Sequence, residues 1–267
     1  MNQITELEQK TIYIIREAYA QYKGKMAMLW SIGKDSTSLL WLCRKAFFGK
    51  LPFPVMHIDT SFKFKEIYEF RDKYTKEWGL DLIVAKNEEA LKRGVNPKKG
   101  KFECCTELKT NALKQAMTKY GFRALLLAIR RDEHGIRAKE RVFSPRDEHF
   151  TWDYKNQPAE LWDQYKSKLA QDQHFRIHPM LHWTEKNIWE YILRENIPIT
   201  SLYFSKNGKR YRSIGCETCC NPVCSNAKTV KEIVEELKVT KTAERAGRAQ
   251  DKEQAYMMQK LRTLGYM

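Results

Sequence analysis

Two sets of residues in this 267-residue chain have types and spacings that could do chemistry, and the first is a short polar loop. Ser31-Ile32-Gly33-Lys34-Asp35-Ser36 lies between an apolar run at 27–30 and an apolar helical run at 39–48. A loop in this position can aim backbone N–H groups and the positive end of the helix at phosphates. Gly33 lets the backbone come close, the serine hydroxyls donate hydrogen bonds, and Lys34 offsets charge. The pattern predicts a phosphate site without the Walker spacing. The alternative is an ordinary turn with polar residues.

The second set is a group of cysteines. Cys104 and Cys105 precede a helical pattern, and Cys216 and Cys219 form a CxxC pair far along the chain. Four soft thiolates suit zinc or an iron-sulfur cluster, although adjacent cysteines strain to ligate one small ion together. The odd total of seven cysteines argues against a disulfide framework, and free thiols remain an alternative. The other three are interpreted as spare thiols or alternative ligands (Cys220 and Cys224) and as plain core (Cys43).

The elements that must position these residues alternate between strand and helix. Apolar runs that read as buried strands lie at 27–30, 55–59, 82–85 and 124–129. Helical patterns lie at 4–22, 39–48, 65–78 and 107–119. Such alternation predicts an α/β fold with a Rossmann-like (HUP-type) parallel sheet flanked by helices, and ligands gather at the carboxyl ends of its strands.

The regular pattern loosens after Arg130. A candidate edge strand runs from His174 to His178, and a helix over 184–195 starts at Thr184 with Asn187 as a weak capping-box partner. Residues 205–224 read as a basic cysteine-rich loop, and 228–265 as one or two exposed amphipathic helices. We therefore expect a nucleotide-binding domain over 1–200 and a cysteine-rich, helical extension over 201–267.

The phosphate loop and many other segments resemble the adenine-nucleotide α-hydrolase family, which includes ATP pyrophosphatases and PAPS reductases. The best match within it is to the small subunits of sulfate adenylyltransferase. The segments that carry the resemblance are 31–36, 51–54, 57–60, 68–72, 119–122, 130–133, 137–141, 183–185, 225–227, 244–245 and 247–248. The resemblance thus covers nearly the whole chain.

This resemblance implies an ATP pyrophosphatase that binds ATP through residues 31–36, transfers AMP and releases pyrophosphate. It implies that Asp59 lies near the nucleoside and that the catalytic residues are Lys34, Asp35, Arg130, Arg131 and Arg137. Guanidinium forks suit developing phosphoryl charge. The alternative for Asp59 is that its carboxylate only caps the end of a strand. The alternative for the three arginines is that they are solvated and paired with the neighbouring acidic residues. Mg²⁺ is expected with ATP, with Asp35 as a candidate ligand.

The cysteine set resembles that of assimilatory adenylyl-sulfate reductases, which hold a [4Fe-4S] cluster with such residues. Carried over by position, the ligands are Cys104, Cys105, Cys216 and Cys219. This resemblance favours an iron-sulfur cluster over zinc. The small subunits of sulfate adenylyltransferase lack such a set, so the acceptor is open.

The net charge of +15 indicates a polyanionic ligand or partner. No apolar stretch reaches the length of a membrane span, so we expect a cytoplasmic protein. Basic stretches at 92–119 and 206–212 flank the proposed cluster ligands. If those ligands meet, the stretches form a positive rim. The aromatic residues Tyr203, Phe204 and Tyr211 are then either a surface for stacking bases or packed core.

Two acceptors follow from these features. Under the leading hypothesis AMP is transferred to nucleic acid, as in DNA phosphorothioation, and a cysteine desulfurase supplies sulfur. Under the alternative the acceptor is sulfate, and a GTPase large subunit drives the reaction. Reduction of adenylyl sulfate ranks third, because residues 225–267 contain no cysteine. A non-enzymatic binding module ranks last, and a homo-oligomer remains open.

Overall fold

A six-stranded sheet forms the centre of the computed structural model, which describes residues 2–166, 168, 173–249 and 256–266. Its order is β3-β2-β1-β4-β6-β5. The strands are β1 Met26–Leu29, β2 Val55–Ile58, β3 Leu82–Ala85, β4 Ala124–Leu126, β5 Phe143–Arg146 and β6 His174–Ile177. All neighbours pair in parallel except β5 with β6. The predicted Rossmann-like α/β fold is confirmed.

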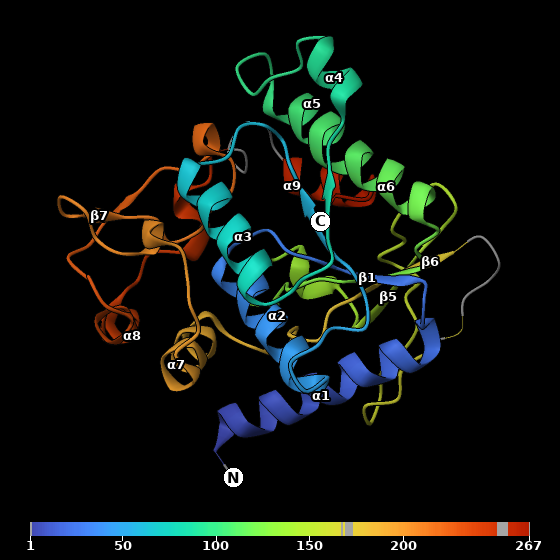
Figure 1. Ribbon diagram of the computed structural model, residues 1–267, viewed down its shortest axis with the longest axis horizontal. Coiled ribbons are helices and arrows are strands. Elements are labelled where there is room, and N and C mark those ends of the chain that lie inside the picture. Colours follow the sequence, from blue (N-terminus) through green and yellow to red (C-terminus); the bar gives the residue numbers. More distant parts are fainter. Residues whose placement is uncertain (1, 167, 169–172, 250–255, 267) are drawn as a thin grey trace.

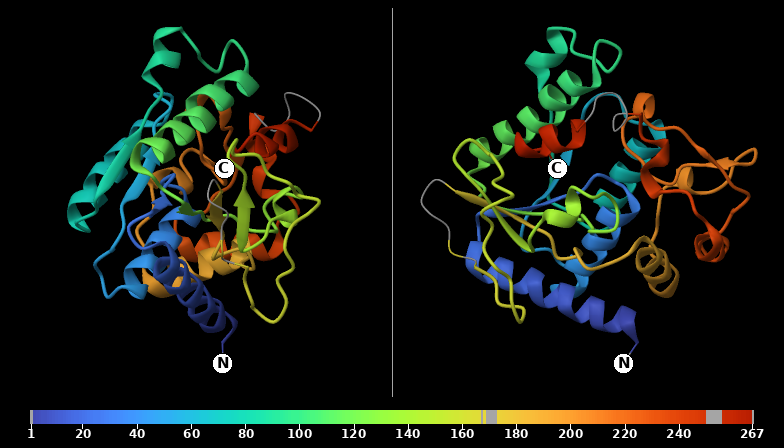
Figure 2. Two further views of the ribbon diagram at one scale, coloured as in Figure 1. Left: turned by 90° about the vertical axis from the view of Figure 1, so that its right-hand side faces the viewer. Right: turned by 180° about the vertical axis from the view of Figure 1, so that it is seen from behind.

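Helices cover both faces of this sheet (Figures 1 and 2). Because side chains alternate along a strand, Met26 and Met28 of β1 pack into one core and Ala27 and Leu29 into another. The first core lies under α1 Gln3–Tyr22, α2 Lys34–Ala46, α3 Lys65–Glu77 and α7 Glu185–Glu195. The second lies under α6 Ala112–Tyr120, with α4 Glu88–Lys92 and α5 Lys101–Cys105 beyond it.

Strand β6 corrects one prediction. It is an inner strand between β4 and β5 rather than the edge, and β5 forms that edge. The sequence of β5, Phe-Ser-Pro-Arg, is short and contains Pro145, which suits only an edge strand because proline cannot donate to the ladder. Such a strand carries no alternation by which it could be recognised.

The helical prediction at 107–119 is correct in kind but hides an irregular turn. Residues Thr106–Asn111 form a π-helical turn between α5 and α6. Cys104 and Cys105 lie in α5, immediately before this turn, and Lys109 lies within it. Such turns are frequent at functional sites. At the start of α7, by contrast, Thr184 and Asn187 form both bonds of a capping box.

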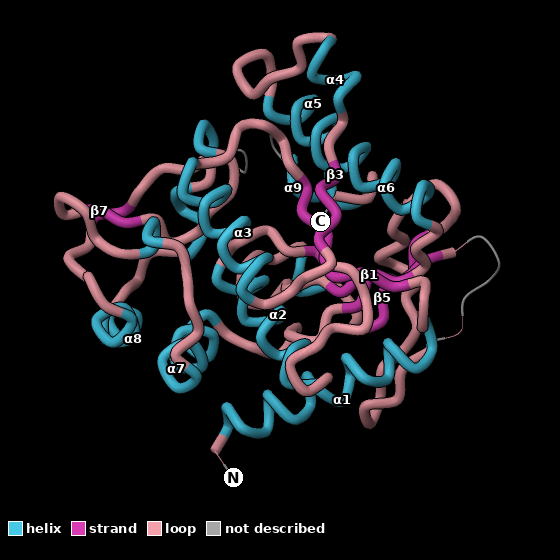
Figure 3. Tube along the Cα trace, viewed as in Figure 1, coloured by secondary structure: helices cyan, strands magenta, loops and turns pink. Residues whose placement is uncertain are grey.

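The C-terminal extension is mostly loop (Figure 3). Its elements are the hairpin β7 Lys209–Arg210 with β8 Val223–Cys224, α8 Val230–Val239, a 3-10 turn Glu244–Gly247 and α9 Met257–Thr263. Helix α8 is amphipathic and packs on α7. Helix α9 was expected to be exposed, but its Met257, Met258 and Leu261 are buried. The apolar side of α9 docks beside Cys105 and Trp152, which its sequence alone could not show.

No helix among the described residues is long and apolar enough to cross a membrane.

Arg176 of β6 is a buried cation with too few partners. One Nη donates to the Gly265 carbonyl at 2.6 Å, but its Nε and other Nη have no partner. Burial, then Arg146 and Arg262, lower its pKa far below the ordinary range. These two neighbouring arginines already share the single carboxylate Glu140.

We expect Arg176→Met to raise the free energy of unfolding by about 1–3 kcal/mol, because it removes an uncompensated buried charge. Urea unfolding at pH 7.5 measures the change. The matched variant Arg146→Met removes a paired arginine, which bonds Glu140 at 2.8 Å, and should lower stability instead. A loss of stability in Arg176→Met equal to that of Arg146→Met would contradict the prediction.

Candidate functional site

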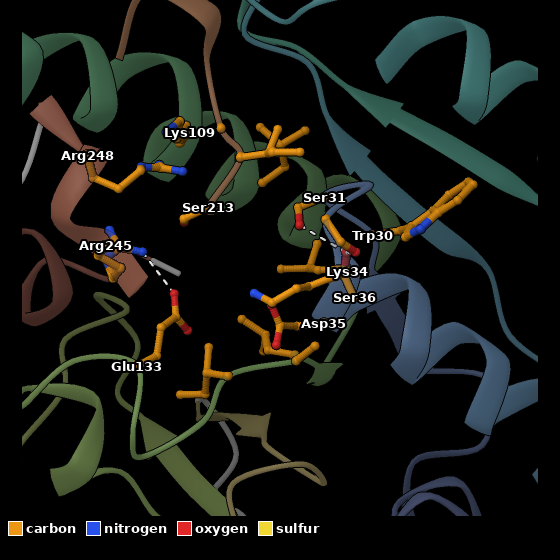
Figure 4. A pocket seen from close by; sticks show the side chains of 18 of the residues that line it. Trp30, Ser31, Lys34, Asp35, Ser36, Lys109, Glu133, Ser213, Arg245 and Arg248 are labelled. Carbon is orange, nitrogen blue, oxygen red and sulfur yellow. Dashed lines mark hydrogen bonds and ion pairs between the residues drawn. The ribbon is translucent and has the colours of Figure 1, made fainter. Parts of the chain in front are cut away.

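A pocket lies at the carboxyl ends of β1, β2 and β4, where a sheet of this kind binds ligands (Figure 4). Ser31, Gly33, Lys34, Asp35 and Ser36 form one side of it. Apolar side chains from the strand ends form its floor: Leu29, Met56, Ile58, Leu127 and Ile129. The extension closes the other side with Ser213, Ile214, Gly215, Arg245, Arg248 and Tyr266.

The loop before α2 is held in a strained and well-bonded shape. The hydroxyls of Ser31 and Ser36 lie 3.0 Å apart, and the backbone N–H of Lys34 donates to the hydroxyl of Tyr203 at 2.8 Å. Ile32 has a φ of 66°, which a β-branched residue adopts rarely and at a cost. Ile32 is buried in the core and is not among the residues that line the pocket. The loop therefore presents its serines and Lys34 because its backbone is fixed.

Lys34 and Arg130 form a buried ionic cluster at this side. The Lys34 ammonium bonds Asp35 at 3.0 Å and also bonds Glu244. The side chains of Lys34 and Arg130 are each at most 1% exposed. Arg130 bonds Asp35 and Glu244 as well, and its Nε donates to Asp132 at 2.9 Å. Burial lowers the pKa of Lys34, but Glu244, Glu185 and Tyr203 together outweigh it, and the net shift is upward. Lys34 lines the pocket, whereas Arg130 is not among the residues that line it.

Glu133 binds two more arginines. Arg245 donates to Glu133 at 2.9 Å, and Arg137 pairs with the other oxygen. All three residues line the pocket. Burial of Arg137 lowers its pKa to about 10, although Glu133 raises it. These residues add a second charged wall, which Figure 4 shows across from Asp35.

Two predicted site residues lie elsewhere. The carboxylate of Asp59 accepts hydrogen bonds from the Tyr68 hydroxyl and the Ser61 N–H, both at 2.8 Å. Arg131 points toward His182, 3.0 Å away. Neither is among the residues that line the pocket, so the structure does not bring them to its walls.

The far end of the pocket is strongly cationic. Lys63, Lys109 and Arg248 line it, and Figure 4 places Lys109 and Arg248 across the cavity from the loop. The strongest electrostatic neighbours of Lys63 are cysteine thiols, Lys109 and Arg248 rather than carboxylates. Lys109 also donates to the Tyr266 hydroxyl at 3.2 Å. This end is arranged to hold an anion.

The four predicted ligand cysteines are electrostatic neighbours of one another and of Lys109 at this cationic end. All four are buried, and Cys105, Cys216 and Cys219 each affect the pKa of Cys104, which burial raises to about 12. Burial alone would raise the pKa of Cys216, but Lys109, Lys63 and a hydrogen bond with Thr60 hold it at about 7.

The metal group of these cysteines stays a prediction. In the described part of the chain no three side chains of His, Cys, Asp or Glu lie close enough to bind one metal ion. A [4Fe-4S] cluster takes one thiolate on each of four irons, whereas zinc is a single ion that its ligands share.

The remaining cysteines have other surroundings. Cys43 is fully buried in the core below α2, as predicted. The Cys220 sulfur accepts a hydrogen bond from the Gly215 N–H at 3.0 Å, and Cys224 lies exposed in β8.

The predicted positive rim is largely absent. Arg210 is buried against Glu236 and Arg212 against Glu185, so half of the second basic stretch is neutralised. Figure 1 shows the β7 hairpin well apart from α4 and α5, which carry much of the first stretch. The carboxylates that pair with Arg210 and Arg212 lie on α8 and α7, so they approach the arginines only in the folded chain. The sequence around these arginines therefore contains no acidic residue that would reveal the pairing.

The proposed aromatic stacking surface is also not formed. Tyr203 is buried against Trp189, and its hydroxyl is used by Lys34. Tyr211 packs edge-on against Phe64 with ring centroids 4.9 Å apart. Tyr203 is therefore packed core, which was the alternative to a stacking surface.

Six pocket or cluster residues were not predicted as site residues: Lys63, Lys109, Glu133, Arg245, Arg248 and Glu244. A signal existed for Glu133, Glu244, Arg245 and Arg248, because 130–133, 244–245 and 247–248 contribute to the family resemblance. Lys63 has no such signal, since only the fold brings it to the pocket.

Comparison with known proteins agrees with this geometry. Residues 25–222 match the model of the phosphoadenosine phosphosulfate reductase domain. Sulfate adenylyltransferase subunit 2 of Pseudomonas aeruginosa is 42% identical, and that of Escherichia coli 41%, each over 100% of this chain and 98% of the relative.

Two solved structures show the same fold at low identity. An FMN adenylyltransferase of Candida glabrata with FMN and an ATP analogue has a TM-score of 0.58 and 20% identity, covering 82% of this chain and 64% of that one. A phosphoadenylyl-sulfate reductase of Candida auris has a TM-score of 0.57 and 16% identity, covering 84% and 98%.

Proposed function

Because the chain belongs to the phosphoadenosine phosphosulfate reductase domain family, we propose that it is an ATP-using enzyme that transfers AMP to sulfate and releases pyrophosphate. The observation that carries this proposal is a single pocket with a phosphate loop at one end and a cationic wall at the other. Its relatives named as subunit 2 of sulfate adenylyltransferase favour sulfate over the nucleic acid that the sequence placed first.

In the proposed reaction a sulfate oxygen attacks the α-phosphorus of ATP. A new P–O bond joins sulfate to AMP, the bond between the α-phosphorus and the bridging oxygen breaks, and pyrophosphate leaves with that oxygen. The leaving group gains negative charge, so donors fixed beside it lower the barrier. Ser31, Ser36 and Lys34 are such donors, and Asp35, which also bonds Arg130, holds Lys34. Mg²⁺ bound to the phosphates would neutralise charge further.

The acceptor is proposed to lie at the cationic end. Lys63, Lys109 and Arg248 would hold a dianion facing the nucleotide, and the floor of apolar residues keeps water away from the adenosine. Glu133, Arg137 and Arg245 line the wall between the two ends.

We also propose a [4Fe-4S] cluster on Cys104, Cys105, Cys216 and Cys219. Its support is the burial of all four thiols and their neighbouring lysines, which balance negative charge. Bound there, the cluster would supply a redox-capable or structural centre beside the acceptor. Analysis of protein purified without oxygen is expected to find about four irons and four sulfides per chain. Absence of both would refute the cluster.

A partner subunit is proposed by analogy, since the relatives are named as one subunit of an enzyme. The sequence resemblance favours a GTPase for that partner. Co-purification with such a subunit tests this part independently of the acceptor.

The acceptor is tested by pyrophosphate release from ATP with sulfate, single-stranded DNA, duplex DNA or transfer RNA added separately. Sulfate is expected to stimulate release, and the product is adenylyl sulfate. Stimulation by a nucleic acid and not by sulfate would reverse this choice.

Transfer to nucleic acid remains the second candidate. The net charge of +15 favours it, as does a cysteine group of a kind used in sulfur transfer, for which a desulfurase would be the donor. The neutralised arginines of 206–212 count against it.

Gly247 provides a test of how the extension shapes the pocket. A Cβ at this position would lie 2.4 Å from the backbone oxygen of Asn221, so Gly247→Ala must displace the turn that carries Arg245 and Arg248. We expect kcat/KM for sulfate to fall by about 10- to 100-fold. Gly135→Ala is the matched control, because its Cβ would meet nothing within 4 Å. Equal activities of the two variants would contradict the prediction.

A further inference from the structure

Glu244 is a buried carboxylate that does not line the pocket, yet it contacts two central cations. One of its oxygens bonds the Lys34 ammonium and the other bonds Arg130. The side chain is 7% exposed. It reaches the loop from the extension, 210 residues away in sequence from Lys34. No other described carboxylate except Asp35 is shared by these two cations.

The next residue, Arg245, pairs with a carboxylate instead of with cations. It donates to Glu133 at 2.9 Å. Two consecutive residues of one turn therefore bind groups of opposite charge on different segments: Glu244 binds Lys34 and Arg130, and Arg245 binds Glu133. The turn is also fixed by the Asn221 N–H, which donates to the Gly247 carbonyl at 2.9 Å. Arg248 follows and lines the cationic end. Any shift of Glu244 therefore moves two arginines of the pocket.

We propose that Glu244 is a positioning residue that holds the ammonium of Lys34 and the guanidinium of Arg130 beside the phosphate chain of the nucleotide. It acts through these cations rather than on the substrate. Through Arg245 and Arg248, the same turn ties the nucleotide side of the pocket to the acceptor side. This inference rests on the proposed use of ATP and assigns a role to a residue of the extension.

The charges around Lys34 explain why one carboxylate matters. Lys34 faces Asp35 of α2, Arg130 after β4, Glu185 of α7, Tyr203 of the extension and Glu244. Burial and Arg130 lower the pKa of Lys34, and among the groups that raise it Glu244 is the strongest. Asp35 is divided between the two cations. Without Glu244, the ammonium keeps only the carboxylate that it shares with Arg130, and it loses its direction.

The test compares Glu244→Gln, which keeps the shape but removes the charge, with Glu244→Asp, which keeps the charge. In Glu244→Gln we expect kcat for pyrophosphate release to fall by roughly 10- to 100-fold, with KM for ATP changed less than about 3-fold. Glu244→Asp should recover kcat to within about 3-fold of wild type. Glu235→Gln, an exposed glutamate on α8, is the control and should match wild type.

Several outcomes would overturn the inference. They are a wild-type kcat in Glu244→Gln, or a joint fall of kcat, ATP affinity and thermal midpoint, as general damage would give. If Glu244→Gln does not fold, Glu244→Asp decides: the shorter side chain should lower kcat by about 3-fold, and an unchanged kcat refutes the role. Calorimetric titration of wild type with ATP separates the two proposals. No ATP binding refutes the proposed function, whereas binding with equal activity of Glu244→Gln refutes only the positioning role.

Discussion

Lys34→Met is expected to lower kcat for pyrophosphate release by about 10²- to 10³-fold, the range seen when one fixed donor to a developing anion is removed. Lys34 is the cation of the loop that reaches the pocket, and it is almost completely buried. Methionine fills similar space without charge, so the loss falls on the chemistry more than on the fold. Stopped or steady-state assays of pyrophosphate at saturating ATP measure the change.

Two further variants show whether the loss is due to the charge of Lys34. Lys34→Arg keeps the charge and should retain more activity than Lys34→Met, although the planar group cannot reproduce the bonds to both Asp35 and Glu244. Lys65→Met removes an exposed lysine of α3 and should have wild-type activity. If Lys34→Met kept kcat within 3-fold of wild type, the loop would not stabilise the leaving group.

The second large effect concerns acid stability. Burial lowers the pKa of His57 and of His178 to about 3 in each case, whereas an unfolded histidine titrates near 6.5. The folded state therefore binds fewer protons, its stability is complete above pH 6.5, and it is lost as pH falls from 6.5 toward 3. At pH 5 each histidine is expected to cost about 2 kcal/mol, or about 4 kcal/mol for the pair.

Urea unfolding at pH 7.5 and pH 5.0 measures this loss. His178 bonds the Arg141 carbonyl at 2.8 Å and is fully buried, so His178→Gln should remove about 2 kcal/mol of the pH-dependent change even if it lowers stability at pH 7.5. His149 is exposed, and His149→Gln should leave the change intact. Equal stability of the wild-type protein at both pH values would show that these histidines are solvated.

The sequence predicted what depends on neighbours in the chain. Strand β1, the loop 31–36 and helix α2 are continuous, so their periodicity and polarity suffice. The ligand set of four cysteines was predicted through resemblance rather than spacing, and it stays a prediction. Cys104 and Cys216 are electrostatic neighbours only because α5 and the extension lie at the same end of the sheet.

Features that depend on distant pairing were missed. Strand β5 exists because β6 offers it an edge, and α9 is buried because α5 and Trp152 offer it an apolar surface. Likewise Arg212 looked like part of a free basic patch until Glu185, on α7, was seen to neutralise it. Local patterns contain no information about such partners.

The distance along the chain between Lys34 and Glu244, and between Lys109 and Tyr266, also orders events during synthesis. A ribosome delivers the phosphate loop early and the turn at 244–248 late, so the pocket can close only after almost all of the chain has emerged. Incomplete chains that end before this turn would have a loop without its counter-charge and an uncovered α5. They are thus expected to consume no ATP and to expose apolar surface that quality-control proteases recognise.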